Sequence, residues 1–160
     1  MDRGLMRSFI VVSVCLLASG VTANASAHGD WLDGCRQVVL DYAYYRDRPD
    51  ADGVANLFTL DGTFTIGPDT FSSREAIRNR IALAADGPLF RHMMSTIHIE
   101  PVSKDEATGI SYATVYVAPP GDLPRQVSTF AALGEYHDSF VREGETCKIK
   151  AREFVRVLVP

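Results

Sequence analysis

The chain contains no long run of lysine or arginine. Of its 160 residues, 16 are Lys or Arg and 20 are Asp or Glu, so the formal net charge is −4. Nucleic-acid binding depends on clustered cationic side chains that contact phosphates, and this composition argues against a nucleic acid as the main partner. Internal repeats, low-complexity segments and an interdomain linker are also missing. The length fits a single domain.

The apolar run near the N-terminus, Phe9–Ala18, is too short to span a bilayer comfortably. Arg3 and Arg7 precede it, and Ala25–Ala27 follows it as a small-x-small sequence. This layout is typical of a secretory signal peptide. We therefore expect residues 1–27 to be removed and the remaining chain to be exported without stable membrane insertion. An uncleaved anchor helix is the alternative.

Cysteine is scarce, with three residues in the whole chain. Cys15 lies inside the apolar run, and Val14 before it is not the small residue of a lipoprotein signal. A soluble periplasmic or secreted protein is therefore expected. Removal of the signal leaves Cys35 and Cys147, and two cysteines in an exported chain suggest one disulfide. It would tie the first helix to the last hairpin; the alternative is two buried free thiols.

Residues 28–160 form the expected domain, in which three helices come before most of the strands. Helical spacing of apolar residues, breaks at Gly and Pro, and runs of strand-forming residues define the elements. The helices are expected at Trp31–Tyr45, with Asp30 as a cap, at Ala51–Leu57, and from Ser72–Glu75 to about Asp86. A short strand is expected at Thr63–Ile66, and long antiparallel strands at about 91–101, 107–117, 125–141 and 147–159.

Helices segregated from an antiparallel sheet indicate an α+β fold. The second long strand has apolar residues on both faces, which predicts a curved sheet. One face would meet the helices and the other a second subunit, in a homodimer or homotrimer. Small residues such as Ala113 and Ala131, beside Val115, would leave a hollow for a ligand.

His92 opens the first long strand just after the Gly87–Pro88 break, and it is the best candidate for the centre of a chemical site. An imidazole can accept a proton near neutral pH. The alternative is a structural histidine in a buried hydrogen bond. His98 and Glu100 are expected on the same strand face, but the strand separates them widely from His92, so no metal site is predicted.

The order of these elements resembles the nuclear-transport-factor-2-like cone, and within it the SnoaL-like group. The resemblance extends from about Leu32 to Val157, and is strongest for the scytalone dehydratase and hexachlorocyclohexane dehydrochlorinase branch. It implies a cone-shaped sheet with three N-terminal helices over its concave face. The stretches that carry it are Asp47, Asp52–Phe58, Arg74–Ile77, Arg91–His92, Tyr136–Phe140 and Ile149–Arg152.

Asp47 and His92 fall where the dehydratase and dehydrochlorinase branches keep a catalytic dyad. Tyr42 and Arg152 fall at pocket-lining positions of the dehydrochlorinase. The resemblance implies a lyase or isomerase that needs no cofactor and abstracts a proton from a small hydrophobic molecule, whether aromatic, polycyclic or polyketide-like. The alternative for Asp47 is a cap on the second helix.

Three positions depart from the relatives. Ile66 and Val117 stand where scytalone dehydratase has a helper tyrosine and a second histidine, and Cys147 stands where the family usually has tryptophan. The dyad favours an enzyme, whereas the missing helpers favour an exported protein that binds a hydrophobic ligand without transforming it. A purely structural dimer is a third possibility, because the fold alone does not specify a function.

Overall fold

Three helices and six strands make up the part of the chain that the structure describes. The computed structural model covers residues 22–127 and 129–160, with side chains described from Trp31 onward. Residues 1–21 of the expected signal peptide lie outside this part, so its cleavage stays a prediction. In chain order the elements are α1 (Thr22–Arg46), α2 (Ala51–Asn56), β1 (Phe58–Ile66), β2 (Asp69–Ser72), α3 (Arg74–Ala82), β3 (Leu89–Pro101), β4 (Glu106–Ala118), β5 (Ala132–Glu143) and β6 (Thr146–Leu158).

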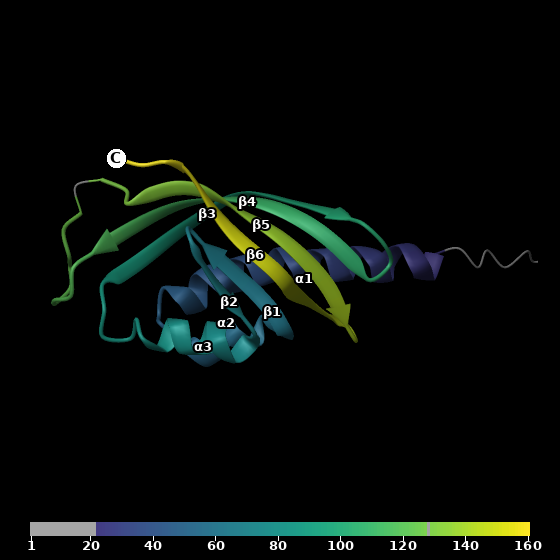
Figure 1. Cartoon of the computed structure of the whole chain (residues 1–160). Helices are drawn as coiled ribbons and strands as arrows, with labels where there is room; N and C mark the ends of the chain where they lie inside the picture. The colour runs from purple at the N-terminus through teal and green to yellow at the C-terminus, as the bar shows by residue number, and fades with distance from the viewer. Residues whose placement is uncertain (1–21, 128) are drawn as a thin grey trace, which may run out of the picture.

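The strands form one sheet in the order β2-β1-β6-β5-β4-β3. β3 to β6 form an antiparallel meander, whereas β1 enters beside β6 and pairs with it in parallel. Figure 1 shows the long strands arching over α1, with α2 and α3 packed together near β1 and β2. The predicted α+β architecture, a curved sheet with helices over one face, is confirmed. The sheet curls without closing, because β2 and β3 remain as edges.

The third long strand begins at Ala132, not near residue 125 as the sequence suggests. Pro124 has no N–H to donate to a strand partner, and Arg125 donates to two carbonyls of its own loop. The chain before Ala132 is therefore a loop. Its end is fixed to β4 because the Ala131 N–H donates to the Val115 carbonyl at 2.7 Å.

Two helix ends and one break also differ from expectation. α1 starts before Asp30, so that residue is not its N-terminal cap. α3 ends short of Asp86, and the Leu83 side chain that follows it is 83% exposed, so no packing holds a further turn. The expected break at Gly67 is the turn of a short hairpin in which β2 pairs with β1, and Gly67 has a φ of +58° there.

α1 packs its apolar side against the sheet, and a disulfide fixes it there. Cys35 on α1 is bonded to Cys147 on β6, 112 positions away, and both residues are buried. Closing a loop of that length stabilises the folded state by about 4–5 kcal/mol in the chain-entropy model. The buried residues of α1 include Trp31, Cys35, Val38, Val39, Tyr42 and Ala43.

A β-bulge in β3 reverses which residues face the helices. Pairing with β4 slips between Ser95 and His98, and Thr96 has a φ of +47°. One extra residue exchanges the two faces of a strand. His92 therefore faces inward, whereas His98 is exposed and pairs with Glu100 at 3.0 Å on the other face. The expectation that these three residues share one face is wrong, because the bulge interrupts the period-two alternation.

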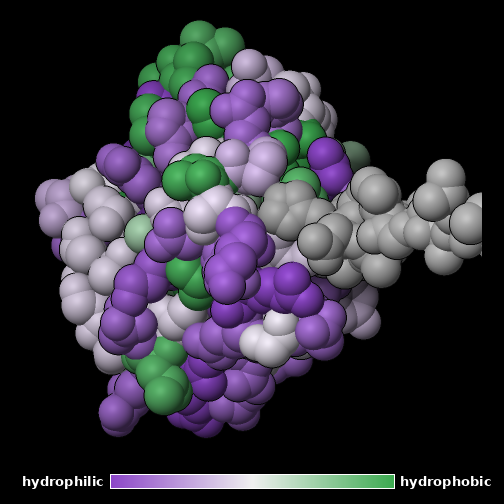
Figure 2. Space-filling view, turned by 90° about the vertical axis from the view of Figure 1, so that its right-hand side faces the viewer, coloured by the Kyte–Doolittle hydropathy of each residue, from purple (hydrophilic) through white to green (hydrophobic). Residues whose placement is uncertain are grey.

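The hydropathy of the molecular surface differs between the end that carries the β3–β4 and β5–β6 turns and the outward face of the sheet. The end formed by the β3–β4 and β5–β6 turns is mainly hydrophilic, with apolar residues in separate patches (Figure 2). The outward face of the sheet carries exposed Met93, Tyr112 and Tyr116. None of the helices in the described residues has the length and hydropathy of a membrane span.

Candidate active site

Asp47 and His92 meet at the junction between the end of α1 and the start of β3. Oδ1 of Asp47 lies 2.6 Å from Nδ1 of His92, and Oδ2 accepts the backbone N–H of His92 at 2.9 Å. Their side chains are only 9% and 6% exposed. The carboxylate thus holds both the ring and the backbone of the same histidine. A contact of 2.6–3.2 Å is the geometry that a general base and its orienting carboxylate require.

This pairing decides which nitrogen of His92 can act as a base. An ionised carboxylate only accepts hydrogen bonds, so the proton of the neutral imidazole must lie on Nδ1. Nε2 then keeps its lone pair and can accept a proton.

The surrounding contacts leave Asp47 free for this role. The cap of α2 is Asp50, whose Oδ1 accepts the Gly53 N–H at 2.8 Å. The alternative in which Asp47 caps the second helix is therefore wrong. Arg91 donates to the Asp47 carbonyl at 3.3 Å, which ties the chain after α1 to β3.

A cavity of about 140 Å³ adjoins His92. An engineered apolar cavity of about 150 Å³ accommodates benzene, so this space suits one aromatic ring. Phe90 stacks on the imidazole with ring centroids 6.3 Å apart. The lining consists of Tyr42, Arg46, Phe64, Ile66, Arg80, Ile81, Phe90, His92, Val115, Val117, Ala131, Ala132, Tyr136, Phe154 and Arg156.

Three of the predicted ligand-contacting residues line this cavity, namely Tyr42, Val115 and Ala131. Ala131 does so from the loop before β5, not from a strand as expected. The expectation that Arg152 lines the same space is not met. Arg152 is buried behind the cavity lining, where its Nε and Nη2 donate to Asp138 at 2.7 and 2.8 Å.

Arg152 instead supports the tyrosines of the cavity wall. Its guanidinium lies 4.2 Å from the ring centroid of Tyr42 and 4.6 Å from that of Tyr136. Burial raises the pKa of Tyr42 and raises that of Tyr136 further, and a hydrogen bond links the two hydroxyl groups. Both tyrosines therefore stay protonated at neutral pH and can donate hydrogen bonds.

Sequence reasoning missed Arg46, although a signal for it exists. Arg46 lies four residues after Tyr42 in the same helix, a spacing that puts both on one helix face, and it directly precedes Asp47. It is 9% exposed, and its guanidinium lies 4.1 Å from the ring centroid of Phe90. Tyr136 was also missed as a lining residue.

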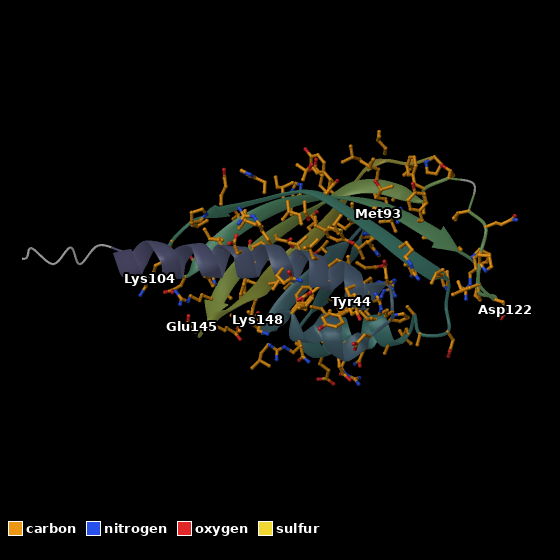
Figure 3. All side chains as sticks on the ribbon, turned by 180° about the vertical axis from the view of Figure 1, so that it is seen from behind. Tyr44, Met93, Lys104, Asp122, Glu145 and Lys148 are labelled. Atoms are coloured by element: carbon orange, nitrogen blue, oxygen red, sulfur yellow. A yellow bond between two sulfur atoms is a disulfide. The ribbon has the colours of Figure 1, made fainter. Side chains whose placement is uncertain are left out.

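A larger groove, of about 450 Å³, is bordered by His98, Glu100, His137 and Glu153, away from the dyad. These residues are exposed and face outward, and the groove does not include His92. Met93, next to His92 in the sequence, is 60% exposed and is labelled on the upper side of the sheet in Figure 3. In the described part of the chain, no group of three or more His, Cys, Asp or Glu side chains could hold a metal ion.

Comparison with known proteins identifies the same fold elsewhere. A SnoaL-like domain family model matches residues 32–153, and no curated protein sequence matches the chain. A candidate scytalone dehydratase from Novosphingobium aromaticivorans is 21% identical, with a TM-score of 0.72 over 85% of this chain and 90% of that one.

Two further solved structures have a similar fold. A nuclear-transport-factor-2-like protein with a cystatin-like fold, from Novosphingobium aromaticivorans, is 23% identical, with a TM-score of 0.70 over 88% of this chain and 92% of that one. A LinA-type hexachlorocyclohexane dehydrochlorinase from Novosphingobium barchaimii is 14% identical, with a TM-score of 0.69 over 86% and 91%. At such identities the likeness shows a shared fold, and the expected nuclear-transport-factor-2-like fold is confirmed.

Proposed function

Because the chain belongs to the SnoaL-like domain family, we propose that it is a cofactor-independent lyase or isomerase in which His92 is the base. The substrate is a small, mostly hydrophobic molecule that loses a proton from carbon. The observation that supports this most strongly is the 2.6 Å contact between Asp47 and His92 beside a cavity. Solved structures with this fold include a candidate dehydratase and a dehydrochlorinase.

In the proposed reaction, Nε2 of His92 accepts the proton as the C–H bond breaks. Asp47 stabilises the imidazolium that forms, because its negative charge lies against Nδ1. The electron pair left on carbon then expels a leaving group from the neighbouring carbon, which gives elimination. Alternatively, the imidazolium returns the proton to a different carbon, which gives isomerisation. General acid–base catalysis of this kind contributes about 10²–10⁴-fold to the rate.

The rest of the cavity wall suits such a proton transfer. Phe64, Val115 and Phe154 provide an apolar lining, in which the attraction between Asp47 and a protonated His92 is screened less than in water. Ile66 and Val117 also line the cavity, and neither side chain can donate a hydrogen bond. The specific reaction of scytalone dehydratase is therefore not proposed.

The second candidate is an exported protein that binds a hydrophobic ligand without transforming it. The apolar side chains of Ile66 and Val117 favour it, because they supply no helper group beside the dyad. The two candidates differ in one respect: only an enzyme consumes its ligand.

The experiment that separates them is an incubation of the purified protein with an extract of its source cells, followed by mass spectrometry. The wild type should deplete at least one metabolite, and His92→Ala and Asp47→Asn should not. His98→Ala is the matched control, since His98 is on the same strand but faces outward. Depletion by wild type and His92→Ala at equal rates would contradict the proposal, and binding without depletion would favour the second candidate.

A further inference from the structure

We infer that the cavity recognises an anionic oxygen of its ligand, and that Arg46 is the residue that binds it. The recognised molecule is thus a ring-sized apolar compound with either a carboxylate or a carbonyl that becomes an enolate. The binding part of this inference stands on its own contacts. Only the reaction step, in which a proton passes to His92, rests on the proposed function.

The guanidinium of Arg46 is buried without its full set of partners. Arg46 is 9% exposed, and its Nη1 has no hydrogen-bond partner. Within the described residues, no carboxylate forms a salt bridge with it. Leaving a charged donor buried and unsatisfied costs more free energy than leaving a neutral donor so. Nη1 is closed off from a molecule the size of water, so a ligand oxygen in the cavity that Arg46 lines would accept from it after a small rotation of the guanidinium, and this would remove that cost.

Arg46 and His92 border the same small space from two different elements. Arg46 closes α1 and lies over one face of Phe90, with 4.1 Å between the guanidinium carbon and the ring centroid. Phe90 in turn stacks on His92. Both Arg46 and His92 line the cavity of about 140 Å³. A ligand that fills this cavity therefore lies against the base and the guanidinium together.

The charges of the lining favour an anion. Arg46, Arg80 and Arg156 all border the cavity, and among the described residues no Asp or Glu is part of its lining. Asp47 is engaged by His92 on the far side of the imidazole. A cleft bordered by charge of one sign raises the local concentration of the opposite sign.

The same contact would assist proton abstraction next to a carbonyl group. The C–H bond breaks, the proton moves to Nε2 of His92, and the electron pair forms a carbon–carbon double bond. The π electrons of the carbonyl move to its oxygen, which becomes negative. Arg46 donates to that oxygen, and a charge-assisted hydrogen bond is about twice as strong as a neutral one. Expulsion of a leaving group or return of the proton to another carbon then restores the neutral carbonyl.

The first test is calorimetric titration with benzoate and with benzamide, which share one ring but differ in charge. Wild type should bind benzoate roughly 10-fold or more tightly than benzamide, because a charge-assisted hydrogen bond is about twice as strong as a neutral one. Arg46→Gln should abolish the preference and leave benzamide binding nearly unchanged. Arg46→Lys should keep part of the preference for benzoate.

The control is Arg48→Gln. Arg48 also covers an aromatic ring, that of Tyr44 at 3.7 Å, but it is exposed and outside the cavity. It should leave the preference for benzoate intact. The titrations measure binding alone and require no proton transfer to His92. The two hypotheses can thus fail separately. Thermal unfolding of each variant checks that the cavity is still formed.

The second test distinguishes the two sources of the anion. 4-Nitrophenol bound to wild type should ionise at a pH below its pKa in solution, whereas 4-nitrophenol bound to Arg46→Gln should not. Absorbance of the phenolate will measure this. This result together with weak benzoate binding supports an enolate oxygen that forms during the reaction. Preferential benzoate binding supports a carboxylate already present. The inference is overturned if wild type binds neither benzoate nor 4-nitrophenol. It is also overturned if Arg46→Gln retains both the preference for benzoate and the ionisation of bound 4-nitrophenol.

Discussion

Asp47 makes two hydrogen bonds to His92, and only one of them involves the ring. Because Oδ2 is held by the backbone N–H of residue 92, the carboxylate keeps its place even where the imidazole is removed. A loss of activity in His92→Ala would therefore report the missing base and not a displaced aspartate.

Replacement of Asp47 separates charge from position. Asp47→Asn keeps an oxygen for the backbone N–H but loses the negative charge, and its amide can favour the wrong tautomer of His92. We expect the folded variant to lose about 10²–10⁴-fold in kcat. Steady-state kinetics on the metabolite that the wild type depletes will measure this, with circular dichroism as the check on folding. A change confined to KM would contradict the assigned role.

The buried tyrosines give the stability a dependence on alkaline pH. An unfolded tyrosine ionises near pH 10.0, whereas burial raises the pKa of Tyr136 well above that value. As the pH rises past about 10, the unfolded state loses the proton first, so the free energy of unfolding falls with rising pH. Below that pH both states keep the proton and this contribution is constant.

Tyr136→Phe should flatten this dependence by up to about 1.4 kcal/mol per pH unit, the value for one proton. Urea unfolding at a series of pH values from neutral to above 10 will measure it. The control is Tyr44→Phe, since Tyr44 is 53% exposed. Equal slopes for wild type and Tyr136→Phe would contradict the assignment.

At the scale of elements, the bulge in β3 decides which side chains reach the cavity. It depends on Thr96, whose φ of +47° is unfavourable for a β-branched residue. Asparagine tolerates this conformation better, so Thr96→Asn should raise the free energy of unfolding by roughly 0.5–1 kcal/mol. The same change at Thr108, on neighbouring β4, should lower it. Urea denaturation of Thr96→Asn and Thr108→Asn will measure both changes. A loss of stability in Thr96→Asn would contradict the claim that the backbone at Thr96 is strained.

The disulfide connects the element that carries Tyr42 and Arg46 to the sheet. Its removal in the double variant Cys35→Ala, Cys147→Ala should lower the free energy of unfolding by about 2–5 kcal/mol. Urea unfolding with and without a reductant will measure the effect. The reductant should destabilise the wild type and leave the double variant unchanged. No effect of reductant on the wild type would contradict a bond between the two cysteines.

How far the sequence predicts the structure also differs between elements. The apolar spacing of α1 and the breaks at glycine and proline predict the helices and most strands, because burial of one face enforces a period. The bulge at Thr96 leaves no such signal, since a single extra residue carries no period. The Asp47–His92 pair was predicted from the resemblance, because the two residues are 45 positions apart in the sequence and no local pattern links them. Arg46 was missed because its burial depends on the distant Phe90.

At the scale of the whole molecule, the outward face of the sheet still carries apolar side chains. Met93, Ile110, Tyr112 and Tyr116 are between 37% and 60% exposed there. Exposed apolar patches of this kind mark interaction surfaces, and most oligomers are symmetric assemblies of one chain. We therefore expect a homodimer or homotrimer that uses this face.

Light scattering after gel filtration will test the assembly. The wild type should have two or three times the mass of one chain, and Tyr112→Lys should reduce it to one. Leu83→Lys is the control, because Leu83 is 83% exposed but follows α3, away from the outward sheet face. A wild type that runs as a single chain at all concentrations would contradict the expectation.

The central claim is that His92 takes a proton from carbon, and isotope transfer tests it most directly. Once the depleted metabolite is known, it can be deuterated at the carbon that loses its proton and turned over in ordinary water. Elimination should release that deuterium to the solvent, and isomerisation should move it to another carbon or exchange it with the solvent. We predict that wild type does so and that His92→Ala and Asp47→Asn slow the transfer by about 100-fold or more, while His98→Ala does not. Transfer at the wild-type rate in His92→Ala would contradict the claim.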